Sequence, residues 1–215
     1  MIRYFKLKRY NFLVTLKKEF SNPKKEVKAG DVYLTIDSDK YEKIMDNNYG
    51  DYLKIVKDLY HYTGIDFYFQ KYPNFRYNTK DDSYPVWHSD RFFNHNKDEI
   101  NVMIPITKKE FGFEVVGWFS HILNLFPLSV LNSKFGKWFL DKISLKINDL
   151  NEIMVFDSYH IHTASNRKSF KNPRLSIDLR LLPIKHSKNY KLSKRNIPMK
   201  PGYYFSEKPI SEYIK

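Results

Sequence analysis

The chain has 215 residues and a mass of 26.0 kDa, which suits one compact domain and is short for two. A hydrophobic fraction of 42%, an aromatic fraction of 17% and a mean hydropathy of -0.59 argue against both a disordered tail and a membrane-spanning protein. The net charge of +13 lies at the two ends, +7 in residues 1–30 and +6 in residues 184–215, so the basic ends favour either an anionic partner or simple solubility.

The N-terminal nine residues interleave charged and apolar side chains and contain no apolar signal core. No stretch reaches the roughly 18 unbroken apolar residues that a membrane-spanning helix needs. The absence of cysteine excludes disulfides, thiolate metal ligands and a cysteine nucleophile. We therefore expect a cytoplasmic protein in which any metal is held by His, Asp or Glu.

Two helices are predicted first, after a capping sequence at residues 37–39, through residues 41–60 with a break at 47–50. From Gly64 on, short runs rich in β-branched and aromatic residues follow, separated by Pro, Asn and Asp clusters. Helices followed by many short strands predict a mainly β protein, a sandwich or small barrel with N-terminal helices on one face. The predicted strands are residues 65–70, 74–77, 100–107, 111–116, 152–156 and 175–182.

Residues 117–146 interrupt the strand pattern with an aromatic and leucine-rich segment that contains a proline. One interpretation is a pair of helices that pack into the core between strands. The alternatives are a lid over the site, an apolar channel, or an interfacial helix that contacts a membrane or another subunit. Residues 184–215 are predicted to form a basic, loop-like C-terminal tail.

His88 and Asp90 are two residues apart, and such residues project to the same face of a strand, so both can reach one metal ion. Some seventy residues later, a strand ends near His160 and His162, which share a face, so periodicity does not choose between them. Arg174 follows twelve residues after His162. This order is that of the two-His-one-carboxylate triad, which leaves positions on Fe(II) for 2-oxoglutarate and O₂, with an arginine fork for the far carboxylate.

Five segments together resemble the Fe(II)/2-oxoglutarate-dependent oxygenases, and within them the phytanoyl-dioxygenase-like branch that includes the carbohydrate- and antibiotic-cluster oxygenases. The resemblance implies a double-stranded β-helix (jelly-roll, cupin-like) core over about residues 65–183. It also places His88, Asp90 and His162 on iron and Arg174 on 2-oxoglutarate. The long insertion at 117–146 departs from that branch, in the region where a substrate is selected. The segments are residues 69–76, 88–90, 99–107, 162–166 and 174–180.

Further polar residues fall on strands expected to line the same cavity. Asn101 and Ser176 are expected beside the cosubstrate, with a buried polar network as the alternative for Asn101. Arg76, Arg180 and His160 are expected beside the substrate. The alternatives are a buried polar network for Arg76, a structural ion pair for Arg180 and a structural histidine for His160.

Taken together, residues 1–215 are expected to form one oxygenase domain that uses Fe(II), 2-oxoglutarate and O₂ and releases succinate. A polar, possibly anionic small molecule, a carbohydrate or a sugar-derived metabolite, is the expected substrate for hydroxylation or another oxidation. A macromolecular or lipid-linked substrate and a non-catalytic jelly-roll binding protein remain alternatives. A nucleic-acid partner is not expected, because no known nucleic-acid-binding module is present.

Overall fold

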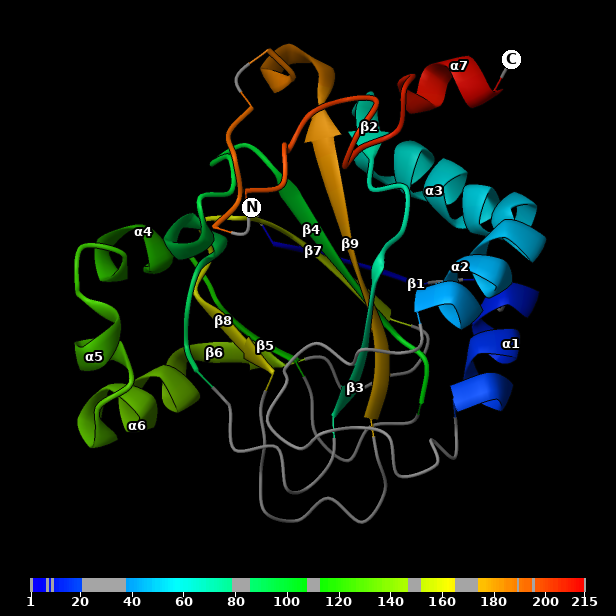
Figure 1. The fold of residues 1–215 in the computed structure, drawn as a ribbon. Helices are drawn as coiled ribbons and strands as arrows, with labels where there is room; N and C mark the ends of the chain where they lie inside the picture. The colour runs from blue at the N-terminus through cyan, green and yellow to red at the C-terminus, as the bar shows by residue number, and fades with distance from the viewer. Residues whose placement is uncertain are drawn as a thin grey trace.

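The computed structural model describes residues 2–6, 8, 10–20, 38–78, 86–107, 113–146, 152–164, 174–188, 190–194 and 196–214 (Figure 1). Its strands are β1 (Arg3–Lys6), β2 (Phe67–Phe69), β3 (Asn74–Asn78), β4 (Ile100–Pro105), β5 (Phe113–Val116), β6 (Ser144–Lys146), β7 (Glu152–Asp157), β8 (His162–Ala164) and β9 (Arg174–Pro183). Its α-helices are α1 (Asn11–Phe20), α2 (Ser38–Asn47), α3 (Tyr49–Thr63), α4 (Ser120–Leu123), α5 (Leu128–Leu131), α6 (Lys134–Ile143) and α7 (Ile210–Ile214). There are also two short 3₁₀ helices, η1 (Asp90–Phe93), which begins at the candidate ligand Asp90, and η2 (Ile184–His186), which follows β9.

The strands form two antiparallel sheets. The larger sheet has the order β1-β7-β4-β9-β2, and β3 pairs with the other end of the long strand β9. The smaller sheet has the order β6-β5-β8. Apolar side chains from both sheets pack together between them, which makes the two sheets face each other; they are Met103, Phe113, Val115, Met154 and Phe156.

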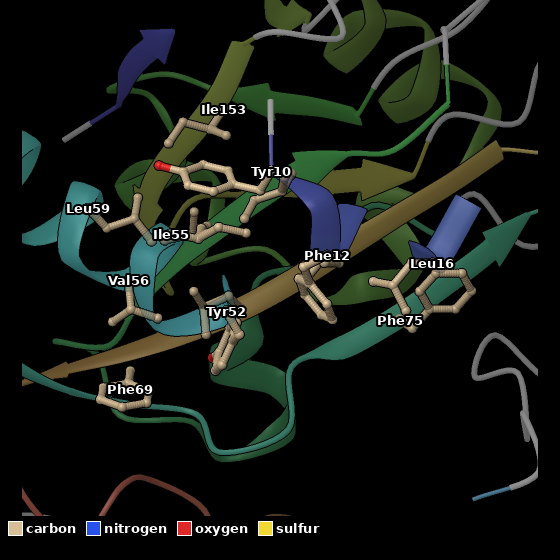
Figure 2. Packing of buried hydrophobic residues seen from close by; sticks show 14 of the residues in the cluster. Tyr10, Phe12, Leu16, Tyr52, Ile55, Val56, Leu59, Phe69, Phe75 and Ile153 are labelled. Carbon is tan, nitrogen blue, oxygen red and sulfur yellow. The ribbon is translucent and has the colours of Figure 1, made fainter. Parts of the chain in front are cut away.

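Strand β9 divides the larger sheet into an apolar face and a polar face. Its odd-numbered residues Leu175 to Leu181 belong to the main hydrophobic core, whereas Ser176, Asp178 and Arg180 point to the other side. Helices α1 and α3 cover the apolar face (Figure 2). The alternation of polar and apolar residues along one strand therefore separates the core from the candidate site.

Helix α3 shows why the predicted helices form. Its buried residues Tyr52, Ile55, Val56 and Leu59 follow the spacing of one helical face. Gly64 ends the helix with a φ of 66°, and its N–H donates to the carbonyl of Tyr60 at 2.9 Å. The prediction of two helices with a break is confirmed, although the capping sequence at 37–39 lies outside the described side chains.

The sheet and its core extend beyond the predicted range of 65–183. Strand β1 pairs with β7 at the edge of the larger sheet, and Phe12 and Leu16 of α1 are fully buried. The described C-terminal residues also contribute to the core. Phe205 and Ile210 are fully buried, and the backbone N–H of Ser206 donates to the carbonyl of Phe69 at 2.7 Å.

Residues 117–146 form α4, α5, α6 and β6, which lie on the opposite side of the molecule from α1–α3 (Figure 1). Leu131 and Leu140 of this segment pack on Trp87, Val116 and Ile161. The Trp and Phe side chains of this segment are exposed, so the interpretation as a pair of core-packing helices fits Leu131 and Leu140 but not the aromatic residues. Within the described residues, no helix has the length and apolar character needed to cross a membrane.

Candidate metal centre

The structure brings His88, Asp90 and His162 together. One ligand atom from each residue lies within 4.8 Å of the other two, and Asp90 and His162 are buried. The backbones of His88 and His162 pair antiparallel, with N–H to carbonyl distances of 3.0 and 2.8 Å in the two directions. The N–H of Asp90 donates to the carbonyl of Ser158 at 3.0 Å, which fixes the start of η1.

Both imidazoles are held with the same nitrogen directed away from the metal-binding position. Nδ1 of His88 lies 2.8 Å from the carbonyl of Val86, and Nδ1 of His162 lies 2.9 Å from the carbonyl of His160. Because a carbonyl only accepts, each Nδ1 carries its proton, and the lone pair of a neutral ring is on Nε2. The backbone therefore selects the tautomer that ligates a metal through Nε2.

Burial keeps these imidazoles neutral. Desolvation lowers the pKa of His88, and it lowers that of His162 to about 3, with help from the neighbouring His88. At neutral pH both rings are therefore uncharged, with the proton on Nδ1 and the lone pair on Nε2, which is the form that binds a metal.

Asp90 is held by two side chains from the larger sheet. Arg180 Nη1 and the side-chain amide of Asn101 both donate to Oδ2 of Asp90, and Arg180 Nη2 lies 3.3 Å from Oδ1. That Oδ1 is 3.8 Å from Nε2 of His162. Burial alone would raise the pKa of Asp90, but the charge of Arg180 outweighs it and holds the pKa well below its usual range. Asp90 is thus an anion with one oxygen directed toward the histidines.

A chain of buried charges continues from Arg180. Arg180 Nη2 is 3.5 Å from Oδ2 of Asp178, and Arg76 Nη2 donates to the same oxygen. Arg180 Nη1 also donates to Oδ1 of Asn101. Arg76, Arg180 and Asn101 were expected to face substrate or cosubstrate. Their described contacts include the carboxylates of Asp90 and Asp178, and Arg180 also contacts Asn101.

The remaining expected residues lie as follows. His160 is in the turn before β8 rather than on a strand with His162, because β7 ends at Asp157, and its Nδ1 is 2.8 Å from Oδ1 of Asp157. Ser176 is buried opposite Arg76 on β3. The backbone of Arg174 begins β9, while its side chain and residues 165–173 lie outside the described parts.

Two asparagines that the sequence reasoning missed hold the segments that carry the ligands. The side-chain oxygen of Asn132 accepts a hydrogen bond from the backbone N–H of Trp87 at 2.8 Å, and its amide group donates to the carbonyl of Trp87 at 2.9 Å. The side-chain oxygen of Asn124 accepts a hydrogen bond from the Ser89 hydroxyl at 2.7 Å, and its amide group donates to the carbonyl of Tyr159 at 2.6 Å. Both belong to the 117–146 insertion, where an asparagine between helices has no sequence pattern that distinguishes it from a turn residue.

The donor set fits a divalent metal ion that accepts nitrogen and oxygen ligands. Two neutral imidazoles and one carboxylate on one side of an ion leave its other positions open, which is the pattern of non-haem Fe(II) oxygenases. Two buried polar atoms nearby on β9, the Ser176 hydroxyl and Arg180 Nε, have no hydrogen-bond partner among the described residues. They are the kind of groups that a polar ligand would satisfy.

No protein-family model matches the chain, and no curated protein matches it significantly. Among solved structures, the non-haem alpha-ketoglutarate-dependent epimerase SnoN from nogalamycin biosynthesis is 13% identical, with a TM-score of 0.50 over 85% of this chain and 77% of SnoN. SnoN in complex with Fe³⁺, alpha-ketoglutarate and nogalamycin RO gives a TM-score of 0.51, with 13% identity over 85% of this chain and 78% of that one. A Pseudomonas putida prolyl-4-hydroxylase, also 13% identical, gives 0.36 over 85% of this chain and 92% of its own. The SnoN comparisons show that this chain shares the fold of that epimerase.

Proposed function

We propose that the chain is an Fe(II)- and 2-oxoglutarate-dependent oxygenase built on a double-stranded β-helix, of the phytanoyl-dioxygenase-like branch. The observation that carries this proposal is the buried cluster of His88, Asp90 and His162, with both Nε2 lone pairs available and the carboxylate ionised. Bound iron and 2-oxoglutarate would together activate O₂, with the cosubstrate converted to CO₂ and succinate.

The cosubstrate is assigned to the polar face of β9. Ser176 supplies a buried hydroxyl that has no partner among the described residues, and Arg174 precedes it by two positions in the sequence. An arginine fork suits the far carboxylate of 2-oxoglutarate, because it makes two parallel hydrogen bonds. Asn101 and Arg180 hold Asp90 in this proposal.

A hydroxyl-rich small molecule, a sugar or sugar-derived metabolite, is the proposed substrate. The inner face of the larger sheet is polar over Arg76, Asn101, Ser176, Asp178 and Arg180, which favours hydrogen-bonding groups over an acyl chain. SnoN, which has this fold, was solved with the small molecule nogalamycin RO. A lipid-linked substrate is the second candidate, because exposed aromatic residues cover the helices beside the site.

Substrate-stimulated succinate formation tests the proposal. The protein with Fe(II), 2-oxoglutarate and O₂ is screened against phosphorylated sugars and nucleotide sugars on one side and acyl and prenyl compounds on the other. We expect stimulation by the sugar panel, and loss of that stimulation in Asp90→Ala. Stimulation by the apolar panel alone would select the lipid-linked candidate, whereas 2-oxoglutarate binding without any turnover would indicate a binding protein.

A further inference from the structure

The 117–146 insertion exposes an unusual number of large apolar side chains. Single exposed hydrophobic residues are ordinary on a protein surface, but ten within one thirty-residue segment form a patch that marks an interaction site. Their exposed fractions run from 37% for Phe139 to 79% for Leu125. We call this patch the insertion surface: Trp118, Phe119, Ile122, Leu125, Phe126, Val130, Phe135, Trp138, Phe139 and Leu145.

Helix α6 contributes a continuous aromatic stripe to the insertion surface. Phe135, Trp138 and Phe139 are three and four residues apart, and their rings lie beside one another, at 5.8 Å from Phe135 to Trp138 and 6.5 Å from Phe135 to Phe139. Leu140 is the helix's buried residue and packs toward the sheet side. The aromatic stripe therefore lies on a face of α6 that does not pack on the core, since Leu140 makes that contact.

The charges around the stripe are mostly positive. Residues 117–146 contain four lysines, one aspartate and no glutamate. Lys134, Lys137 and Lys142 are exposed on α6, and the one aspartate, Asp141, lies on the same helix. Aromatic residues interleaved with exposed lysines on an amphipathic helix are typical of a helix that lies in a membrane interface.

We propose that the insertion surface docks on an anionic phospholipid bilayer. Its lysines complement the charge of an acidic lipid surface, and the net charge of +13 adds long-range attraction. A second copy of the chain fits less well, because a symmetric contact would bring like-charged lysines together, and lysine is depleted in the cores of protein interfaces. This proposal is independent of the oxygenase assignment.

The insertion is also joined to the segment that carries two of the candidate metal ligands. Asn124 and Asn132, at the ends of α4 and α5, hydrogen-bond to Ser89 and to the backbone of Trp87, the two residues that flank His88. The helices that carry the insertion surface are thus fixed directly to the segment that carries two metal ligands.

Flotation with lipid vesicles tests the proposal on the full chain. We expect the wild type to bind vesicles of phosphatidylcholine and phosphatidylserine in equal amounts, to bind pure phosphatidylcholine vesicles much more weakly, and to be released by high salt. Phe135→Ser with Trp138→Ser should weaken binding roughly tenfold or more, because two exposed rings no longer enter the interface. Lys134→Gln with Lys137→Gln should weaken it by about fivefold per lysine.

A matched control changes exposed apolar residues elsewhere. Leu192 and Tyr203 are 53% and 58% exposed and lie outside the insertion, so Leu192→Ser with Tyr203→Ser should bind vesicles like the wild type. Circular dichroism establishes that each variant is folded. Absence of binding to the acidic vesicles, or equal binding by the lysine and control variants, would overturn the proposal. A wild-type dimer that the Phe135 and Trp138 variant converts to a monomer would assign the surface to a second copy instead.

Discussion

At the scale of single residues, Arg180 is the group that most directly orients the ligand Asp90. It donates to both carboxylate oxygens of Asp90. A single arginine on a predicted strand does not indicate which carboxylate it will contact. The sequence alone therefore does not distinguish a substrate contact from a structural ion pair for Arg180. The spacing of His88 and Asp90 predicted a shared metal, and the family resemblance selected His162 rather than His160 as the third ligand. The tautomer of each imidazole depends on backbone carbonyls that only the fold brings near.

Arg180→Gln is expected to lower metal affinity by about 10- to 100-fold, the usual effect of removing a group that orients a metal ligand. Anaerobic Fe(II) titration measures it. Arg76→Gln is the matched control, since Arg76 shares the partner Asp178 but makes no described contact with Asp90. An equal loss of affinity in both variants would mean that Arg180 acts through the stability of the fold rather than on Asp90.

Asp178→Asn is expected to lower the free energy of unfolding by about 3–5 kcal/mol, because the buried guanidinium groups of Arg76 and Arg180 both lose the charge of Asp178. Urea denaturation measures the change. Asp51→Asn, which removes one partner of the surface pair with Lys54, should change stability by less than about 1 kcal/mol. A loss below that size in Asp178→Asn would show that the buried charge chain contributes little.

The advantage of the wild type over Asp178→Asn should also depend on pH. Burial raises the pKa of Asp178, but Arg180 and Arg76 outweigh it, so the folded pKa lies below the ordinary value of 3.8. A group with a depressed folded pKa stabilises the fold fully above its ordinary pKa, and this contribution falls as pH drops below 3.8 toward the folded value. Urea denaturation of both proteins across that interval checks the direction; an advantage that grows as the pH falls would contradict it.

At the scale of elements, strands and helices with clear periodicity were predictable and short edge elements were not. Strand β9 alternates polar and apolar residues over its length, and α3 repeats its apolar residues at helical spacing. Strand β1 has only four residues, mostly exposed, and exists because β7 offers it an edge to pair with. The burial of Phe205 likewise depends on contacts with Leu182, which is far away in the sequence, and with Met199, which lies in a loop.

Gly136 sets the close contact between α5 and α6. A Cβ atom at this position would lie 2.3 Å from the carbonyl oxygen of Val130 and 2.6 Å from that of Leu131, both of which are backbone atoms. Gly136→Ala should therefore lower the free energy of unfolding by about 1–3 kcal/mol. Thermal unfolding measures it, with Gly50→Ala as the control.

Gly50 lies in α3, where a Cβ atom would meet no other atom within 4 Å and the backbone is not left-handed. Gly50→Ala should raise stability by roughly 0.5–1 kcal/mol through helix propensity alone. If Gly136→Ala is equally benign, α5 and α6 are free to move apart, and the geometry of the insertion surface is not fixed by this contact.

At the scale of the whole molecule, one face of the larger sheet packs on the core and the other carries the candidate site. Helices α1 and α3 bury the apolar face (Figure 2). The polar face carries the charges that hold Asp90 beside the histidines. The mainly β fold with N-terminal helices was predictable from the order of elements. The exposure of the insertion was not predictable, because the sequence of an aromatic-rich segment does not indicate whether its side chains pack into the core or face solvent.

The most direct test of the central claim is an anaerobic Fe(II) titration in the presence of 2-oxoglutarate, followed by the charge-transfer absorption that the cosubstrate gives when it chelates iron. We predict one Fe(II) per chain for the wild type and for His160→Ala, and loss of the absorption in His88→Ala, Asp90→Ala and His162→Ala. Retention in His162→Ala with loss in His160→Ala would contradict the ligand assignment, and iron binding without any effect of 2-oxoglutarate would contradict the proposed chemistry.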